Sequence, residues 1–219
     1  MITPRLNSIL QHITGKTVAD IGTDHAYIPI SLAKNGRISR AVACDIKKGP
    51  LDIARKNVEK YGFLDIIELR LGAGLEPLSE NETETVIIAG MGGEMIMNIL
   101  ENEKSHTFGE IILQPMNCQA ELRKWLTGHN FEIISEDLSK EGFKVYNLIK
   151  IRPGKMKNFE SEIELHLPAY LHENPLFPML YEKKKREFTK ILTGLEKAEK
   201  KDREMLSKYS ALLEEMKKI

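Results

Sequence analysis

The amino-acid sequence predicts an α/β protein built on a doubly wound, mostly parallel sheet. Short apolar runs rich in β-branched residues alternate with segments of helical periodicity through most of the chain. Glycines and acidic residues directly follow several of these runs, as they do where parallel strands end at a ligand-binding edge. The last two runs are joined by a short polar segment, which predicts a final strand inserted antiparallel.

Seven strands and the helices between them can be placed from this pattern. After an amphipathic opening segment at residues 4–13, we expect strands at residues 17–21, 41–45, 66–71, 85–89, 110–114, 131–136 and 145–151. Helical patterns fill most gaps, at residues 28–34, 50–61, 94–100 and 119–127. Five βα units followed by two strands joined through DLSKEGF (residues 137–143) are typical of class I, Rossmann-like methyltransferases. A dinucleotide-binding fold would more often continue with parallel units.

Composition is consistent with a cytosolic enzyme. The 219 residues suffice for one ordinary domain with an appendage. Because the formal net charge is zero, attraction to nucleic acid has to come from local patches. Cys44 and Cys118 have neither metal-site nor disulfide-framework spacing, and no apolar run is long enough for a membrane span or signal peptide. We expect a cytoplasmic protein that binds neither a metal nor a membrane.

The loop after the first strand indicates the kind of ligand. Strand TVADI is followed at once by Gly22, which permits a sharp turn and a close approach of the ligand to the backbone. Dinucleotide-binding loops carry three glycines here because they hold a pyrophosphate, whereas this loop continues with TDHAY (residues 23–27). Asp24 would repel a phosphate. The loop favours a ligand with a positive centre and no phosphate, such as S-adenosylmethionine. The alternative is an ordinary α/β turn.

Other strand ends extend this predicted pocket. Asp45 ends the second strand, where an acid hydrogen-bonds ribose hydroxyls, although a solvated carboxylate is the alternative. Glycines gather after the third and fourth strands, at GAG (residues 72–74) and GMGG (residues 90–93), where the backbone can approach an adenine ring. Each glycine alone could simply serve a turn. Their coincidence at one sheet edge favours a binding role.

We expect the substrate base beside ILQPMN (residues 112–117). Pro115 fixes its own φ and biases Gln114 toward an extended conformation, which keeps this main chain rigid. Gln114 and Asn117 carry amides that can pair bidentately with an adenine edge, although Asn117 could instead cap a helix. Asp24 is the best candidate acid, for a cofactor ammonium group or the amine of a base, unless it caps the following helix.

The pattern changes around residues 152–154, where Arg-Pro-Gly interrupts the alternation. We therefore expect a methyltransferase domain over residues 1–154 and a helical domain over residues 155–219. Apolar residues recur at helical spacing in two stretches of the tail, separated by EKKDRE (residues 199–204). Two helices in an antiparallel coiled-coil hairpin fit this pattern best; a single solvated helix or a dimerising coiled coil are alternatives. We expect a monomer, with dimerisation through the tail as the alternative.

Basic residues that could contact RNA form local groups. They are Arg5, Lys47 and Lys48, Arg123 and Lys124, and, in the tail, Lys183, Lys184, Lys185 and Arg186. Each phosphate that such a residue neutralises contributes a salt-dependent term to binding. Acidic residues are interleaved with them, so charge alone does not separate an RNA substrate from a small molecule.

Four motifs together resemble the bacterial TrmK family, tRNA methyltransferases that modify N1 of adenine 22 in the D-arm. They are LxxIxxxI near the start, DIGTDHAYIP (residues 20–29), AGMGG (residues 89–93) and ILQPM (residues 112–116). The similarity covers nearly the whole chain, including the tail, and DHAYIP is much more specific than the glycine motif. The resemblance implies S-adenosylmethionine as the cofactor and tRNA as the partner.

The resemblance also implies a role for each strand end. The cofactor pocket would comprise Asp20, Gly22, Thr23, Asp24, His25, Tyr27, Asp45, Ile46, Gly72, Ala73, Gly90, Met91 and Gly92. Within it, Asp45 would bind the ribose and Gly72 with Ala73 would flank the adenine. Asp24, Gln114 and Asn117 would be the catalytic residues. Many related methyltransferases have an acid or amide where Ala73 stands, so backbone N–H groups would have to contact the adenine amine.

The implied reaction depends on positioning more than on a strong base, because the lone pair of adenine N1 can attack the sulfonium methyl group in line. The nucleotide has to leave its stack to reach the pocket. Asp24 would stabilise the cationic ring or accept a proton from N6, and the tail would grip the tRNA body. The alternatives are a methyltransferase of another RNA or a small molecule, and a non-catalytic RNA-binding module.

Overall fold

The computed structural model describes residues 2–198 and 202–219, which form two compact units that divide between Lys157 and Asn158. The expected domain boundary after Gly154 lies shortly before this division. The first unit carries the sheet, and the second consists of helices and turns.

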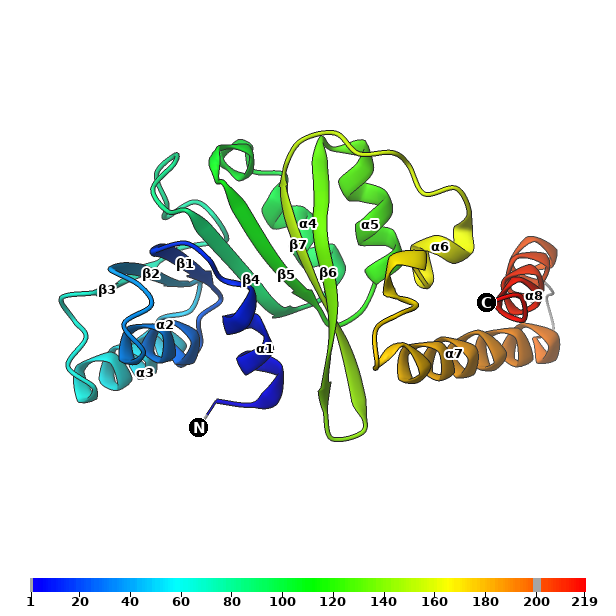
Figure 1. Cartoon of the computed structure of the whole chain (residues 1–219), viewed down its shortest axis with the longest axis horizontal. Helices are drawn as coiled ribbons and strands as arrows, with labels where there is room; N and C mark the ends of the chain where they lie inside the picture. The colour runs from blue at the N-terminus through cyan, green and yellow to red at the C-terminus, as the bar shows by residue number, and fades with distance from the viewer. Residues whose placement is uncertain (1, 199–201) are drawn as a thin grey trace. The chain divides into compact units, whose positions relative to one another are not determined.

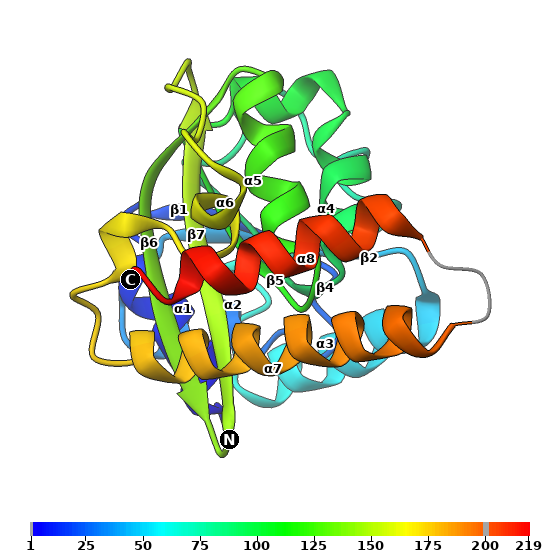
Figure 2. The same ribbon diagram turned by 90° about the vertical axis from the view of Figure 1, so that its right-hand side faces the viewer.

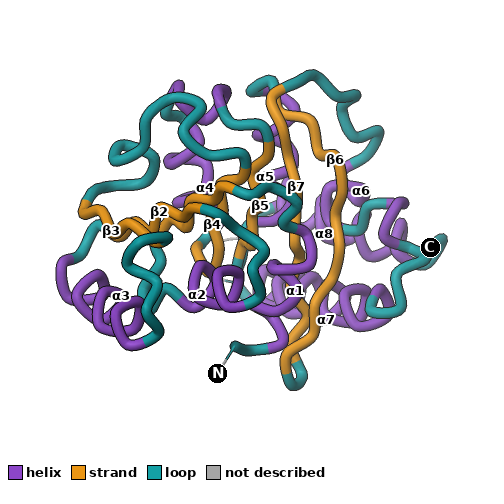
Figure 3. The backbone as a smooth tube through the Cα atoms, turned by 60° about the vertical axis from the view of Figure 1, so that its left-hand side comes forward, coloured by secondary structure: helices purple, strands orange, loops and turns teal. Residues whose placement is uncertain are grey.

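A seven-stranded sheet forms the centre of the first unit (Figures 1 and 3). Its strand order is β3-β2-β1-β4-β5-β7-β6, and Figure 3 shows the strands side by side from β3 to β6. Strands β1 to β5 pair in parallel, and β7 is inserted antiparallel between β5 and β6. The predicted doubly wound sheet is confirmed. The strands are β1 (Thr17–Ile21), β2 (Arg40–Asp45), β3 (Ile67–Leu71), β4 (Thr85–Met91), β5 (Glu110–Pro115), β6 (Phe131–Glu141) and β7 (Lys144–Pro153).

Helices cover both faces of this sheet. They are α1 (Pro4–His12), α2 (Tyr27–Lys34), α3 (Lys48–Lys60), α4 (Gly93–Leu100) and α5 (Gln119–Gly128), with a 3₁₀ turn, η1, at Glu103–Thr107. Successive side chains of a strand point to opposite faces. Val18 therefore packs in the apolar cluster that contains α1, α2 and α3, whereas Ala19 packs in the cluster that contains α4 and α5.

Two predictions about the connections are wrong. Five βα units were expected, but the described residues between β3 and β4 contain turns and no α-helix. Gly72 lies in this connection, and Pro77 packs closely against it. A Cβ on Gly72 would lie 2.4 Å from Pro77 Cγ, so the site has no room for a side chain. Residues 137–143 were expected as a loop, but residues 137–141 continue β6, and only Gly142 and Phe143 form the turn before β7. Leu138 is the one apolar residue of this extension, so no apolar alternation revealed it in the sequence.

The second unit contains α6 (Glu162–His166), a 3₁₀ turn η2 (Ala169–Leu171), α7 (Phe177–Lys197) and α8 (Arg203–Met216). Helices α7 and α8 pack antiparallel (Figure 2): the Tyr181 hydroxyl donates to Met216 O at 3.0 Å, and the Phe188 and Tyr209 rings are 5.6 Å apart. Asp202 caps α8 by accepting a hydrogen bond from Met205 N. The two predicted helices are confirmed and exclude the single-helix alternative, whereas the coiled coil remains a prediction. Residues 199–201 of the EKKDRE segment lie outside the described residues.

Within the described residues, no helix combines the length and the apolar character that a membrane crossing requires.

Candidate active site

The carboxyl ends of β1 and β4 and the start of α1 enclose a cavity of about 350 Å³. This volume lies within the usual range of small-molecule sites. The cavity is lined by Thr3, Arg5, Leu6, Asp20, Gly22, Thr23, Asp24, His25, Tyr27, Ile28, Ala89 and Gly90. The structure therefore brings together all six predicted cofactor residues of the first loop, with Gly90 from the fourth strand and Arg5 from α1.

The loop after β1 has an unusual backbone. Gly22, Asp24 and Ala26 all have positive φ angles, of 73°, 47° and 56°. The N–H groups of Gly22 and Thr23 both donate to Cys44 O, at 2.8 and 2.9 Å, which fixes the turn to the end of β2. Non-glycine residues adopt this conformation at an energetic cost, and such residues concentrate at functional sites. At Gly22 the absence of a Cβ removes this cost.

Asp20 is a buried acid at the base of the cavity. Its carboxylate accepts a hydrogen bond of 2.6 Å from the Thr23 hydroxyl. Burial raises the pKa of Asp20 to about 6, the hydrogen bond from Thr23 opposes this rise, and the charge of Asp45 adds to it. Asp20 therefore takes up a proton at a much higher pH than an exposed aspartate does.

Asp24 presents its carboxylate at the mouth of the loop. The side chain is 64% exposed, and its carboxylate lies 3.3 Å from His25 Nε2. The His25 ring stacks on Tyr27 with centroids 5.0 Å apart, and Asn57 holds the His25 carbonyl through a 3.0 Å hydrogen bond. Helix α2 has Ala26 at its N-cap and no side-chain cap, so the helix-capping alternative for Asp24 is excluded.

Arg5 enters the cavity from α1. Pro4 begins this helix, and the Thr3 hydroxyl caps it by accepting from Leu6 N at 3.3 Å. Arg5 Nη1 then donates a hydrogen bond of 2.5 Å to Gln114 Oε1. The guanidinium also lies 5.8 Å from the Tyr146 ring centroid and 3.8 Å from Glu141. The sequence predicted an RNA contact for Arg5, but the structure places the residue in the wall of the candidate cofactor cavity.

Gln114 and Asn117 lie beside the cavity in the loop that follows β5. Gln114 is buried, and its amide nitrogen faces Pro115 O at 3.4 Å. Asn117 Oδ1 accepts a 3.0 Å hydrogen bond from Gly93 N at the start of α4. Asn117 is thus a cap, as the alternative held, but it caps α4 rather than its own helix. The Asn117 side chain ties the β4–α4 loop to the β5–α5 loop.

The glycines of AGMGG allow this close approach. A Cβ on Gly93 would lie 2.8 Å from Cys118 O, and one on Gly92 would lie 3.1 Å from Asn117 Oδ1. The side chain of Met91 packs against Gly22 of the first loop: its Cε lies 2.2 Å from where a Cβ on Gly22 would be. The two glycines therefore serve packing between loops, whereas Met91 reaches the first loop itself.

The predicted residues of β2 and β3 lie along the neighbouring strand ends rather than in the cavity wall. Asp45 Oδ1 accepts from Lys47 N at 2.8 Å, and the Asp45 carbonyl accepts from Gly72 N at 3.0 Å. Ile46 is 65% exposed, and Ala73 follows Gly72 in the connection to β4. Lys47 and Lys48 are exposed beside Asp45. These residues extend the same sheet edge past the cavity.

Two of the basic residues proposed as RNA contacts are buried. The side chain of Arg123 is fully buried against Glu136, to which its Nε donates at 3.0 Å. Lys184 is buried and lies 2.9 Å from Glu187. Helical spacing did not reveal that these cations face inward, so their assignment to an RNA surface is wrong. Lys183 is half-buried, and Lys124, Lys185 and Arg186 are exposed.

Sequence reasoning missed four lining residues, Thr3, Leu6, Ile28 and Ala89. The amphipathic pattern of residues 4–13 indicated the opening helix, but not that its first turn would lie over the strand ends. Ile28 and Ala89 immediately adjoin predicted site residues, so the motifs themselves located them to within one position.

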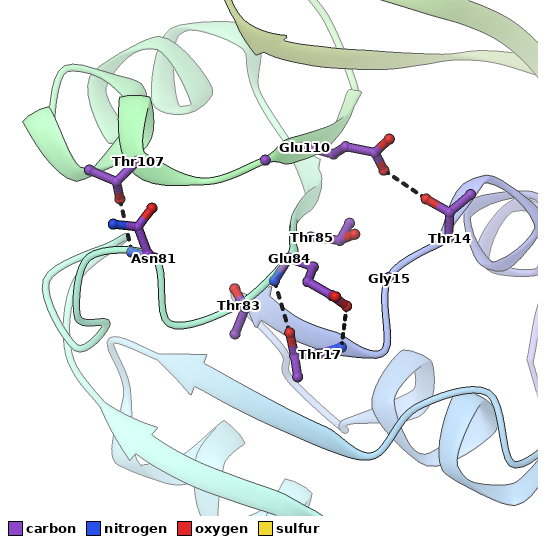
Figure 4. A pocket seen from close by; sticks show the side chains of 10 residues that line it. Thr14, Gly15, Thr17, Asn81, Thr83, Glu84, Thr85, Thr107 and Glu110 are labelled. Carbon is purple, nitrogen blue, oxygen red and sulfur yellow. Dashed lines mark hydrogen bonds between the residues drawn. The ribbon is translucent and has the colours of Figure 1, made fainter.

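A second cavity, of about 540 Å³, lies at the opposite edge, around the amino ends of β1, β4 and β5 (Figure 4). Its side chains mostly bond within the cavity wall: Glu84 accepts from Thr17 N at 3.0 Å, and Thr14 donates to Glu110 at 3.0 Å. None of the predicted site residues lines it. Ligands of open α/β sheets bind at the carboxyl ends of the strands, so the smaller cavity is the candidate active site.

Residues 2–149 match the family model described as "Methyltransferase domain". The tRNA (adenine(22)-N(1))-methyltransferase of Bacillus subtilis strain 168 is 36% identical over 156 residues, 70% of this chain and 66% of that relative's length. The crystal structure of B. subtilis M1A22 tRNA methyltransferase TrmK is similar over 100% of this chain and 98% of its own, with 27% identity and a TM-score of 0.88. M. capricolum TrmK bound to S-adenosyl-homocysteine matches over 100% and 97%, with 32% identity and a TM-score of 0.84.

Proposed function

Because the chain belongs to the TrmK family of methyltransferases, we propose that it transfers a methyl group from S-adenosylmethionine to N1 of adenine 22 in the D-arm of tRNA. One observation carries the proposal: the DIGTDHAY loop, Gly90 and Arg5 converge on a single cavity at the carboxyl edge of the sheet. That edge is where an open α/β sheet binds its ligand.

The cavity lining fits the charges of S-adenosylmethionine. The cofactor has a cationic sulfonium and ammonium, an anionic carboxylate and no phosphate. Asp20 and Asp24 supply acids for the cationic groups, and Gly22 lets the ligand approach the backbone. Among the described lining residues, Arg5 is the one with a permanent positive charge, so it faces the carboxylate. Asp45, next along the edge, binds the ribose hydroxyls.

When bound, the cofactor supplies a methyl group activated by the sulfonium. The chain's own residues hold the base in line with it. The β4–α4 and β5–α5 loops, tied together by Asn117 and Gly93, form a rigid wall beside the cavity. Asp24, exposed at the mouth of the cavity, stabilises the positive charge that develops on the adenine ring and can accept a proton from N6. The adenine leaves its stack to reach this wall.

The tRNA contacts extend beyond the cavity in this proposal. Lys47 and Lys48 are exposed beside Asp45, and Lys185 and Arg186 are exposed on α7. Each would neutralise a backbone phosphate. The enzyme acts as a monomer in the cytoplasm, where unmodified tRNA is present, and the tail grips the tRNA body.

The test is methyl transfer to an unmodified tRNA transcript, followed by mass-spectrometric location of the methyl group. The control is the same transcript with guanosine at position 22. We expect one methyl group at N1 of adenine 22 and none in the control. Transfer to another nucleotide would support the alternative of a different RNA methyltransferase. Cofactor binding without transfer to any RNA would support the alternative of a small-molecule methyltransferase.

A further inference from the structure

The tip of the β6–β7 hairpin exposes a complete aromatic side chain. Phe143 is 101% exposed, more than any other large apolar side chain in the described residues. It follows Gly142, whose φ of 58° closes the two-residue turn between Glu141 and Lys144. A phenyl ring held in water on a tight turn contributes nothing to the folded core. Packing within the described residues therefore does not account for its position.

The hairpin projects from the same sheet edge as the candidate active site. Strand β7 pairs with β5 through Leu113 and Ile149, and β5 ends at Pro115. Because the pairing is antiparallel, the first residues of β7, beginning at Lys144, extend past the carboxyl end of β5. Figure 1 shows this ribbon reaching beyond the other strands, next to α1.

The projecting ribbon is fixed to the wall of the cavity. Arg5, in that wall, lies 3.8 Å from Glu141 and 5.8 Å from the ring centroid of Tyr146. His12, at the end of α1, contacts Asp137 at 3.2 Å. The ladder between β6 and β7 continues to the Glu141–Lys144 pair. The tip is therefore a preformed structure at a set position relative to the cavity.

The chemistry of the tip favours a nucleic acid. Lys140 and Lys144 are exposed on either side of Phe143, and among the described residues neither forms an ion pair with an acid. Glu141, the acid of the turn, faces Arg5 instead. An aromatic ring between free cations matches a base and its flanking phosphates, because bases stack on aromatic rings irrespective of sequence.

We propose that the hairpin tip is a tRNA contact in which Phe143 stacks on a base and Lys140 and Lys144 contact phosphates. This inference rests on the proposed function and adds a docking surface to it. The tip holds tRNA at the rim of the cavity while the target adenine is out of its stack. A second copy of this chain, covering the phenyl ring, is the competing occupant.

The primary test compares F143A with the wild-type protein in tRNA affinity at fixed salt. Stacking on one base is worth about 1–3 kcal/mol, so we expect roughly tenfold weaker tRNA binding. S-adenosylhomocysteine affinity and thermal stability should not change, because the ring touches neither the cavity nor the core. F143W should retain tRNA affinity, and its added fluorescence should be quenched by tRNA. The double variant K140A/K144A should lower the salt dependence of tRNA binding.

The matched control is L64A, which removes another exposed apolar side chain, ahead of β3 at the opposite edge of the sheet. It should bind tRNA as the wild type does. Wild-type tRNA affinity in F143A, or an equal loss in L64A, would overturn the inference. Loss of self-association in F143A with unchanged tRNA affinity would overturn it in favour of a second copy. Site-specific methylation by the wild type, measured in the same preparation, tests the proposed function separately.

Discussion

Arg5 and Gln114 are 109 residues apart in the chain, yet Arg5 Nη1 donates a 2.5 Å hydrogen bond to Gln114 Oε1. This bond joins the first turn of α1 to the end of β5. It also fixes the orientation of the buried amide, because the oxygen faces Arg5 and the nitrogen faces the Pro115 carbonyl. This side-chain pair thus connects the candidate cofactor cavity with the end of β5, where we propose that the substrate base binds.

We expect the two residues to act as a unit. R5A leaves the Gln114 oxygen buried without its donor and removes the cation that we propose for the cofactor carboxylate. The kcat/KM for tRNA methylation should therefore fall at least tenfold. Q114A should lower it as well. The loss of transition-state stabilisation in the double variant should be smaller than the sum of the two single losses. A double-mutant cycle should give a coupling energy of about 1–3 kcal/mol. Strictly additive losses would show that the two side chains act independently.

Asp24 is expected to act on the transition state rather than on the fold. D24N is the appropriate change because asparagine tolerates the positive φ at this position better than alanine does. Turnover should fall about 10²-fold or more, as when other electrostatic contacts to a developing charge are removed. The melting temperature should stay at the wild-type value. Single-turnover kinetics measures this loss, and wild-type turnover in D24N would remove Asp24 from the reaction.

Asp20 should make the ligand-free protein less stable as the pH rises. Its folded-state pKa of about 6 lies above its ordinary value of 3.8, so between these pH values the folded state holds a proton that the unfolded state has lost. Stability from this group is complete below about pH 4 and falls by about 3 kcal/mol on passing pH 6. D20N cannot titrate, so its free energy of unfolding relative to wild type should rise across this window.

Urea unfolding of both proteins at several pH values measures that difference. Acids that do not interact with Asp20 cancel in this difference, because they are common to both proteins. Glu68 and Glu82, whose pKa values Arg70 lowers to about 2, act in the opposite direction and at lower pH. Parallel stability curves for D20N and wild type between pH 4 and pH 7 would contradict the assignment of a raised pKa to Asp20.

Arg123 and Glu136 should matter for stability and not for tRNA binding. Both side chains are fully buried, and Asn147 donates a further 2.8 Å hydrogen bond to Glu136. R123A removes the cation from beside a buried carboxylate and should lower the free energy of unfolding by about 3–5 kcal/mol. K124A, which removes the exposed neighbouring lysine, is the control and should cost less than about 0.5 kcal/mol. Denaturant titration measures the free energy of unfolding of both variants. Equal losses in R123A and K124A would contradict the buried position of Arg123.

The elements of the fold were predictable where local chemistry decides them. Strand β1 was placed to the residue, and the antiparallel insertion of β7 followed from the closeness of the last two runs. The hairpin tip was missed because residues 139–144 read SKEGFK, in which Phe143 is the one apolar side chain, so no alternation marks the strand ends. The contact between Pro77 and Gly72 could not be predicted either. It depends on how the connection between β3 and β4 folds back, and sequence periodicity carries no information about that.

The sequence predicted which residues of the candidate site lie at each strand end. It did not predict the contacts between residues of different strand ends. Topology alone places the first loop and Gly90 at one edge, and the structure joins them in one cavity. The contact between Arg5 and Gln114, and the cap that Asn117 provides to α4, depend on tertiary register between distant segments. A helical pattern likewise shows which residues share a face, but not that the face with Arg123 lies against Glu136.

A crystal structure of the chain with S-adenosylhomocysteine tests the central claim most directly. We predict that the homocysteine part occupies the cavity beside Gly22, with its carboxylate against Arg5 and its ribose hydroxyls on Asp45. The adenine should lie near Gly72 and Ala73. Electron density for the ligand at any other place, with the cavity beside Gly22 holding only solvent, would contradict the account.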